Sequence, residues 1–129
     1  MVRGSCLCGT VAFEARLPFA KFVACYCSRC RKASGSAHSA NAYVSPDAFR
    51  WTRGEDRVVR YDLAEARSFS TGFCGTCGAP VPHATRSGRE IIIPAGSLDE
   101  APGAKPSGRA HWGSRAAWAP TPADLPIEE

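Results

Sequence analysis

The spacing of seven cysteines constrains this 129-residue chain more than any other feature of its sequence. They form two close pairs and one run of three: Cys6 and Cys8, Cys74 and Cys77, and Cys25, Cys27 and Cys30. An odd number of cysteines cannot all pair in disulfides, and clusters of this density are typical of metal ligands. The spacing therefore predicts four thiolates for one zinc ion and three for a second.

The two pairs provide the four thiolates of a closed, tetrahedral zinc site. Gly9 and Gly78 follow the pairs and allow tight turns around the sulfur atoms. The long loop between the pairs adds little to the cost of closure, because loop entropy grows only logarithmically with length. We therefore expect a structural zinc on Cys6, Cys8, Cys74 and Cys77. A redox pair at Cys74 and Cys77 would need a βαβ context, which the flanking residues do not predict.

The run of three cysteines is the better candidate for chemistry. Three protein ligands and one exchangeable position are the usual composition of a catalytic zinc site, and we expect Cys25, Cys27 and Cys30 to form one. Two alternatives stay open at this point. Either His38 or His83 completes a second structural site, or the three thiols form reversible disulfides without a metal.

Three basic residues lie within or next to this run, namely Arg29, Arg31 and Lys32. They could bind the carboxylates of an anionic substrate, although a solvated basic turn has the same composition. The formal net charge of +4 counts every cysteine as neutral, so it is weak evidence for nucleic-acid binding. A second basic stretch, residues 50–61, is diluted by acidic residues, and we interpret it as a solvated strand and turn.

Apolar and polar residues alternate in several short segments, which is the period of half-buried strands. The expected strands cover residues 9–17, 22–25, 40–44, 57–63, 66–73 and 91–93. One helical segment is expected over residues 28–34, ended by Gly35, and Ser45 with Pro46 predicts a short helical turn. We therefore expect a mainly β fold of several antiparallel strands with short helical turns.

The length fits one domain that covers residues 1–129. Six of the ten prolines lie in residues 94–129, and we expect this segment to wrap over the domain with Trp112 and Trp118 as its bulky anchors. No stretch has the roughly 18 consecutive apolar residues of a membrane span, and no apolar leader precedes Cys6. We expect a cytoplasmic protein, because a reducing compartment favours thiolates over disulfides.

The order of these motifs resembles that of the glutathione-dependent formaldehyde-activating enzyme family, which includes centromere protein V. The resemblance covers most of the chain. It rests on Gly4-Ser5-Cys6-Leu7-Cys8-Gly9, Cys25-x-Cys27-x-x-Cys30, Phe73-Cys74-x-x-Cys77-Gly78, Ala95-Gly96-Ser97-Leu98-Asp99, and the later Pro106, His111 and Trp118.

The resemblance implies a zinc-containing β fold similar to that of methionine sulfoxide reductase B. It implies two zinc ions per chain, a structural ion on the four cysteines and a catalytic ion on the three. Partial occupancy is expected only for the second ion. The implied reaction is carbon–sulfur lyase chemistry, in which glutathione and formaldehyde form S-(hydroxymethyl)glutathione while basic residues after Cys27 hold the carboxylates of the peptide.

One position departs from the family pattern. Many members carry a histidine where this chain has Tyr26, and a phenol is a poorer proton shuttle than an imidazole at neutral pH. The competing hypothesis is a module that binds protein or nucleic acid, with both zinc ions structural. Labile binding of one of the two ions would distinguish the enzyme from the module.

Overall fold

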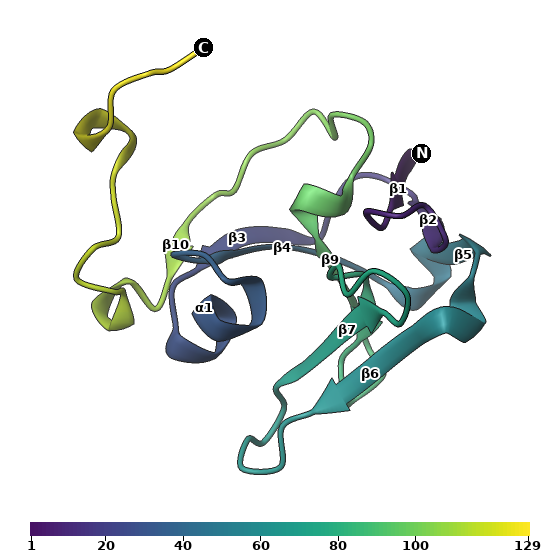
Figure 1. The fold of residues 1–129 in the computed structure, drawn as a ribbon. Helices are drawn as coiled ribbons and strands as arrows, with labels where there is room; N and C mark the ends of the chain where they lie inside the picture. Colours follow the sequence, from purple (N-terminus) through teal and green to yellow (C-terminus); the bar gives the residue numbers. More distant parts are fainter.

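The chain is mainly β, as predicted, in a computed structural model that describes residues 1–129 apart from the side chain of Pro122 (Figure 1). The strands are β1 (Val2–Ser5), β2 (Ala12–Ala15), β3 (Lys21–Cys25), β4 (Ser39–Val44), β5 (Phe49–Arg53), β6 (Val58–Asp62), β7 (Ser70–Cys74), β8 (His83–Ala84), β9 (Ile91–Pro94) and β10 (Arg109–Ala110). The α-helix is α1 (Ser28–Ser34), and 3₁₀ turns cover Pro46–Ala48, Glu55–Arg57, Ala95–Ser97, Trp112–Ser114 and Pro122–Asp124.

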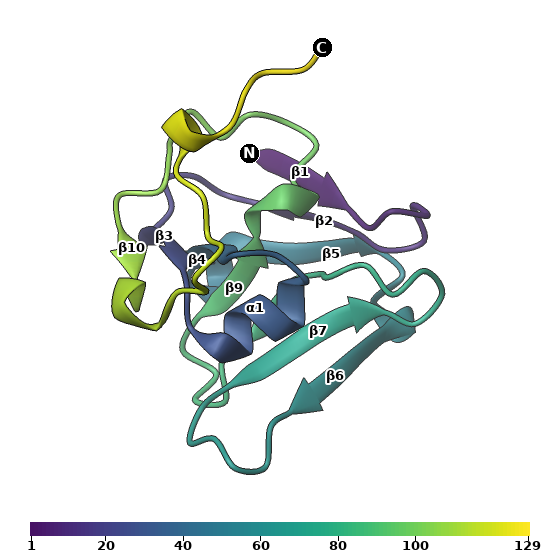
Figure 2. The same ribbon diagram turned by 60° about the vertical axis from the view of Figure 1, so that its left-hand side comes forward.

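The strands form three sheets. One has the order β1-β2-β5, one has the order β10-β3-β4-β9-β8, and β6 pairs with β7 in a hairpin. All pairs are antiparallel except β10 with β3. The central strand of the five-stranded sheet is β4, and α1 and β7 lie on the same side of this sheet (Figure 2).

The main core lies between the three-stranded and the five-stranded sheet. Its buried side chains come from both: Val2, Phe13 and Ala15 from β1 and β2, and Ala42, Val44 and Ile93 from β4 and β9. Because side chains alternate along a strand, this arrangement leaves the other residues of β4 on the opposite face. A second core, formed by Cys6, Val11, Cys74 and Val81, surrounds the predicted structural zinc site.

The helix α1 begins and ends where the sequence predicts. Cys27 is its N-cap, and the Cys27 sulfur accepts a hydrogen bond from the Cys30 N–H at 3.3 Å. Gly35 ends the helix with a left-handed φ of 67°, where a glycine is least strained. The sequence thereby places two of the three clustered cysteines at one helix N-terminus.

The predicted strand 9–17 is too long. Residues 9 and 10 belong to the tight turn that follows Cys8, with Gly9 at φ 78°, so β2 begins only at Ala12. The predicted strand 66–73 also begins too early, because residues 66–69 form the loop that precedes β7. Pro94 pairs with Asn41 as the last residue of β9 instead of ending the strand before it.

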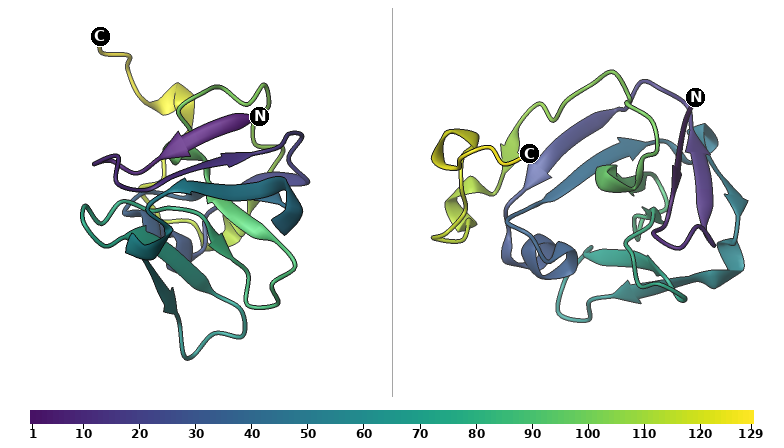
Figure 3. Two further views of the ribbon diagram at one scale, coloured as in Figure 1. Left: turned by 90° about the vertical axis from the view of Figure 1, so that its right-hand side faces the viewer. Right: turned by 45° about the horizontal axis from the view of Figure 1, so that its top comes forward.

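The expected role of Trp118 is wrong. Trp118 is 66% exposed, whereas the Trp112 ring packs nearly perpendicular to the Tyr26 ring, with 4.8 Å between centroids. The segment after β10 therefore attaches through Trp112, the buried Ala116 and Ala119, and only the last residues extend away from the sheets (Figure 3). No helix among the described residues has the length and apolarity needed to cross a bilayer.

Gly54 fixes the distance between β5 and the loop that carries Cys6 and Cys8. It has φ 74°, and a Cβ atom there would overlap the carbonyl oxygen of Thr10. Gly88 has the same φ but open space around it, so it is a matched control. We expect Gly88→Ala to lower the free energy of unfolding by about 1 kcal/mol and Gly54→Ala by about 3 kcal/mol. Equal losses in urea-unfolding measurements would contradict this role of Gly54.

Candidate metal centres

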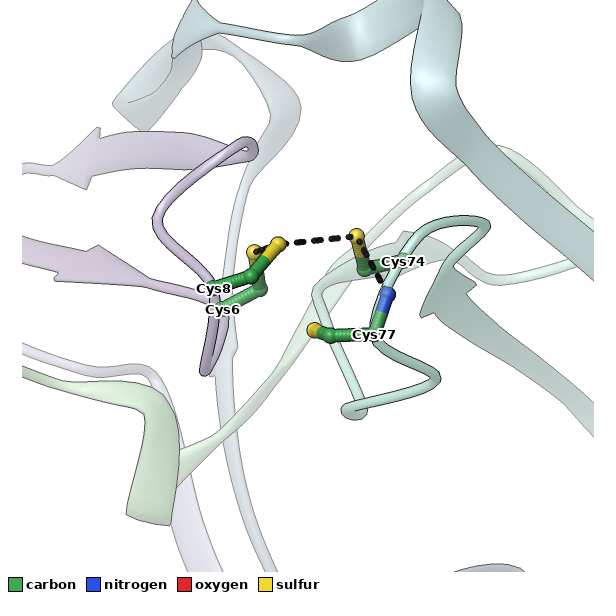
Figure 4. A group of neighbouring side chains, drawn as sticks. All are labelled: Cys6, Cys8, Cys74 and Cys77. Atoms are coloured by element: carbon green, nitrogen blue, oxygen red, sulfur yellow. Dashed lines mark hydrogen bonds between the residues drawn. The ribbon is translucent and has the colours of Figure 1, made fainter.

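The four cysteines of the two predicted pairs meet in space. Cys6 and Cys8 lie in the loop after β1, Cys74 is the last residue of β7, and Cys77 lies in the following turn (Figure 4). Their sulfur atoms all lie within 4.8 Å of one another. The Sγ atoms of Cys6 and Cys8 are 3.7 Å apart, and those of Cys8 and Cys74 are 3.9 Å apart. This separation suits four thiolates around one ion.

Backbone N–H groups point at these sulfur atoms. The Val11 N–H donates to Cys6 Sγ at 3.3 Å, and the N–H groups of Thr76 and Cys77 donate to Cys74 Sγ at 3.3 and 3.5 Å. Such hydrogen bonds favour the thiolate over the thiol, and they also orient the sulfur atoms. The donor set and its hydrogen bonds therefore fit a thiophilic ion such as zinc.

The thiols of this cluster do not ionise equally. Burial raises the pKa of Cys6, whereas hydrogen bonds, that from the Cys77 N–H above all, lower the pKa of Cys74. Hydrogen bonding with the Thr10 hydroxyl lowers the pKa of Cys8 to about 6. A bound cation would remove the repulsion that opposes ionisation of all four.

Cys74 and Cys77 do not have the surroundings of a redox pair. Cys74 ends a strand of a two-stranded sheet, and the next element along the chain is β8, not a helix. A thioredoxin-type site would need a βαβ unit at this position.

The three remaining cysteines form a second cluster. Cys25 ends β3, Cys27 caps α1 and Cys30 lies in its first turn, and their sulfur atoms also lie within 4.8 Å of one another. Among the described side chains, no histidine or carboxylate joins this group. The ring of His38 lies instead against Tyr26, with 4.9 Å between centroids, and His83 lies on β8.

The three thiols of the second cluster also differ in pKa. Burial, together with the neighbouring thiols, raises the pKa of Cys30, and burial raises the pKa of Cys25. Burial also opposes ionisation of Cys27, but hydrogen bonds, that from the Cys30 N–H first, outweigh it and lower its pKa. Cys27 therefore ionises first, and the other two thiols need a cation to follow.

A cleft of about 1490 Å³ opens beside the three-cysteine cluster. Cys25, Cys27 and Cys30 contribute to its wall, and so do Arg29 and His38. Of the three basic residues that the sequence suggested for substrate carboxylates, Arg29 thus faces the cleft. Arg31 and Lys32, on the next turn of α1, are not among its lining residues.

Tyr26 does not face the cleft. Its side chain is buried with Ala24 and Ala37 on the far side of β3, where it contacts His38 and Trp112. Because side chains alternate along the chain here, Cys25 and Cys27 point one way and Tyr26 points the other. Tyr26 is therefore not placed to transfer protons to a substrate in the cleft.

The arginines of the basic stretch that runs through β5 and β6 make contacts within the protein. Arg50 pairs with Glu14, and Arg53 donates to the Gly9 carbonyl at 2.9 Å. Arg57 donates to the Thr76 hydroxyl at 2.8 Å, and Arg60 donates to the Ala84 carbonyl at 2.6 Å. These arginines join neighbouring segments of the chain, as the interpretation of this stretch as a strand face and turn implies.

Sequence reasoning missed the residues of β3 and β4 that line the cleft. Asn41 and Tyr43 occupy alternate positions of the central strand and face the cleft, opposite the core face with Ala42 and Val44. Burial, and to a smaller extent the nearby charges of Cys30 and Glu90, raises the pKa of Tyr43. Asn41 is the one indication in the sequence, because asparagine is disfavoured in the middle of a strand.

The fold and the two clusters define a small β protein whose thiols could hold two metal ions. A family model described as glutathione-dependent formaldehyde-activating enzyme matches residues 1–114. The chain therefore belongs to the glutathione-dependent formaldehyde-activating enzyme family.

Comparison with solved structures supports the fold. A crystal structure of a Rhodobacter sphaeroides protein is 29% identical in sequence, with a TM-score of 0.63. The match covers 81% of this chain and 97% of the other. A search of curated proteins found no match.

Proposed function

We propose that the chain is a zinc enzyme that joins a thiol, such as glutathione, to formaldehyde. The observation that carries the proposal is the difference between the two clusters. Four sulfur atoms form a complete donor set of which only Cys6 borders the cleft, whereas all three cysteines of the other cluster, without a fourth described ligand, lie at the wall of this large cleft. Membership of the family supports the choice of thiol and aldehyde.

In this proposal the clusters have separate roles. Cys6, Cys8, Cys74 and Cys77 hold a structural zinc, and Cys25, Cys27 and Cys30 hold a second zinc that faces the cleft. A zinc ion with three protein ligands supplies an open position for an exogenous thiol or aldehyde and stabilises negative charge there. The seven thiols must stay reduced for this function, which fits a cytoplasmic location.

The reaction needs no oxidant or reductant. A bond forms between the thiol sulfur and the formaldehyde carbon, the carbonyl π bond breaks, and the thiol proton ends on the new hydroxyl oxygen. Arg29 faces the cleft and is assigned to a substrate carboxylate. Arg31 and Lys32 are assigned only to offsetting the negative charge of the thiolates, because they lie outside the cleft wall.

The direct test is exchange NMR of glutathione with ¹³C-formaldehyde, with and without the zinc-loaded protein. The proposal predicts that the protein accelerates exchange between the free thiol and S-(hydroxymethyl)glutathione at concentrations well below those of the reactants. An exchange rate equal to that of the protein-free mixture, from protein that holds two zinc ions, would instead favour a binding module with two structural ions.

A further inference from the structure

One face of the five-stranded sheet forms the floor of the cleft. On β3, Lys21, Val23 and Cys25 line it, while the intervening Phe22 and Ala24 pack elsewhere. This is the period-2 alternation of a strand. The three side chains therefore form one row that begins at the three-cysteine cluster and ends at an ammonium group.

On the neighbouring strand β4, polar side chains form a second row beside the first. The register pairs Cys25 with Ser39, Val23 with Asn41 and Lys21 with Tyr43, and all six residues line the cleft. Of these, Asn41 makes no hydrogen bond through its side chain to another described residue, so its amide is open to the cleft. A bound peptide would meet hydrogen-bonding groups along the whole row.

Lys21 is the free cation at the far end of this row. Its ammonium lies over the Tyr43 ring at 5.0 Å from the centroid, and it forms no ion pair with a described carboxylate. Arg86 also borders the cleft, but its guanidinium already donates to the carbonyls of Leu63, Ala66 and Phe69. Lys21 is therefore available to a ligand in a way that Arg86 is not.

The length of the row fits a peptide-sized thiol. Cys25 lies four positions after Lys21, and four steps along a strand span about 13 Å. An extended tripeptide spans about 10 Å, and the lysine and cysteine side chains shorten the remaining gap. A small thiol such as 2-mercaptoethanol could occupy the cluster but could not reach the ammonium group.

We propose that Lys21 determines substrate specificity, by binding a carboxylate of an extended thiol peptide whose sulfur lies at the three-cysteine cluster. This inference rests on the proposed function for the location of the sulfur. The ring of Tyr43 holds the ammonium over the cleft, and Asn41 faces the peptide between the two ends. The ligand class is thus an anionic thiol peptide, of which glutathione is one.

The test compares Lys21→Gln with Lys105→Gln, which removes the same charge from an exposed residue outside the cleft wall. The first measurement is calorimetric binding of S-methylglutathione, whose blocked sulfur cannot react. We expect Lys21→Gln to weaken binding about five- to tenfold and Lys105→Gln to leave it unchanged. Equal affinities of the two variants, or no binding to the wild type, would overturn the inference.

The second measurement separates this inference from the proposed function. For formaldehyde exchange, Lys21→Gln should raise KM for glutathione by a similar factor, with little change in kcat and no change in KM for 2-mercaptoethanol. An equal effect on both thiols would overturn the assignment. If neither thiol is turned over by any form, the proposed reaction fails, and Lys21-dependent binding of S-methylglutathione still decides the inference.

Discussion

Replacement of Cys27 by alanine should return formaldehyde exchange to the uncatalysed rate, a loss of about 10²-fold or more, while the fold is retained. Cys27 has the thiol that ionises most readily in its cluster, and it caps α1. Two sulfur atoms are too few to retain zinc against water and free thiols. The change should therefore remove the second zinc and leave the first. Loss of the N-cap should lower the free energy of unfolding by about 1 kcal/mol.

The measurements are exchange NMR, zinc content and circular dichroism on the same preparation. Ser36→Ala is the control, because it changes an exposed residue of the segment after α1 without touching a sulfur atom. It should match the wild type in all three. A Cys27→Ala protein that keeps full activity would show that the second cluster has no part in the reaction.

Replacement of Cys74 by serine should instead remove the fold itself and prevent the chain from folding at 25 °C. Cys74 is completely buried, and its sulfur accepts two backbone hydrogen bonds while lying beside the other three. Zinc binding at such sites provides about 10 kcal/mol or more, which is comparable with the whole stability of a domain of this size. The change removes this contribution.

Circular dichroism and urea unfolding provide the measurement, with Cys27→Ala as the matched control because it also removes one metal ligand. Wild-type protein treated with a strong chelator under reducing conditions should resemble Cys74→Ser. A cooperative unfolding transition for Cys74→Ser close to that of the wild type would show that the four-cysteine site does not stabilise the fold.

The sequence alone predicts the parts of this protein that depend on local pattern. The end of the helix Ser28–Ser34 follows from Gly35, and the β6–β7 hairpin follows from alternation on both sides of a turn. The cysteine groups are also visible in the sequence, because each pair or run is already close along the chain. Only the meeting of Cys6 with Cys74 required an argument from zinc chemistry.

The cleft could not be predicted in the same way. Its floor depends on which strands become neighbours, since Lys21 and Tyr43 face each other only because β3 pairs with β4 in one register. Alternation identifies two faces of a strand but does not say which of them meets the core. Trp118 illustrates a different limit: its size and apolarity favour burial, but it lies in an irregular segment where the small Ala116 and Ala119 make the contacts and Trp118 stays exposed.

Native mass spectrometry during mild chelation tests directly whether one thiolate cluster is closed and the other is open. We expect two zinc ions per chain at the start, rapid loss of the ion at the three-cysteine cluster, and slow loss of the ion at the four-cysteine cluster. In Cys27→Ala, only the slowly lost ion should be present. Two ions that leave the wild type at the same rate, or a Cys27→Ala protein that keeps both, would contradict the assignment of one closed and one open zinc site.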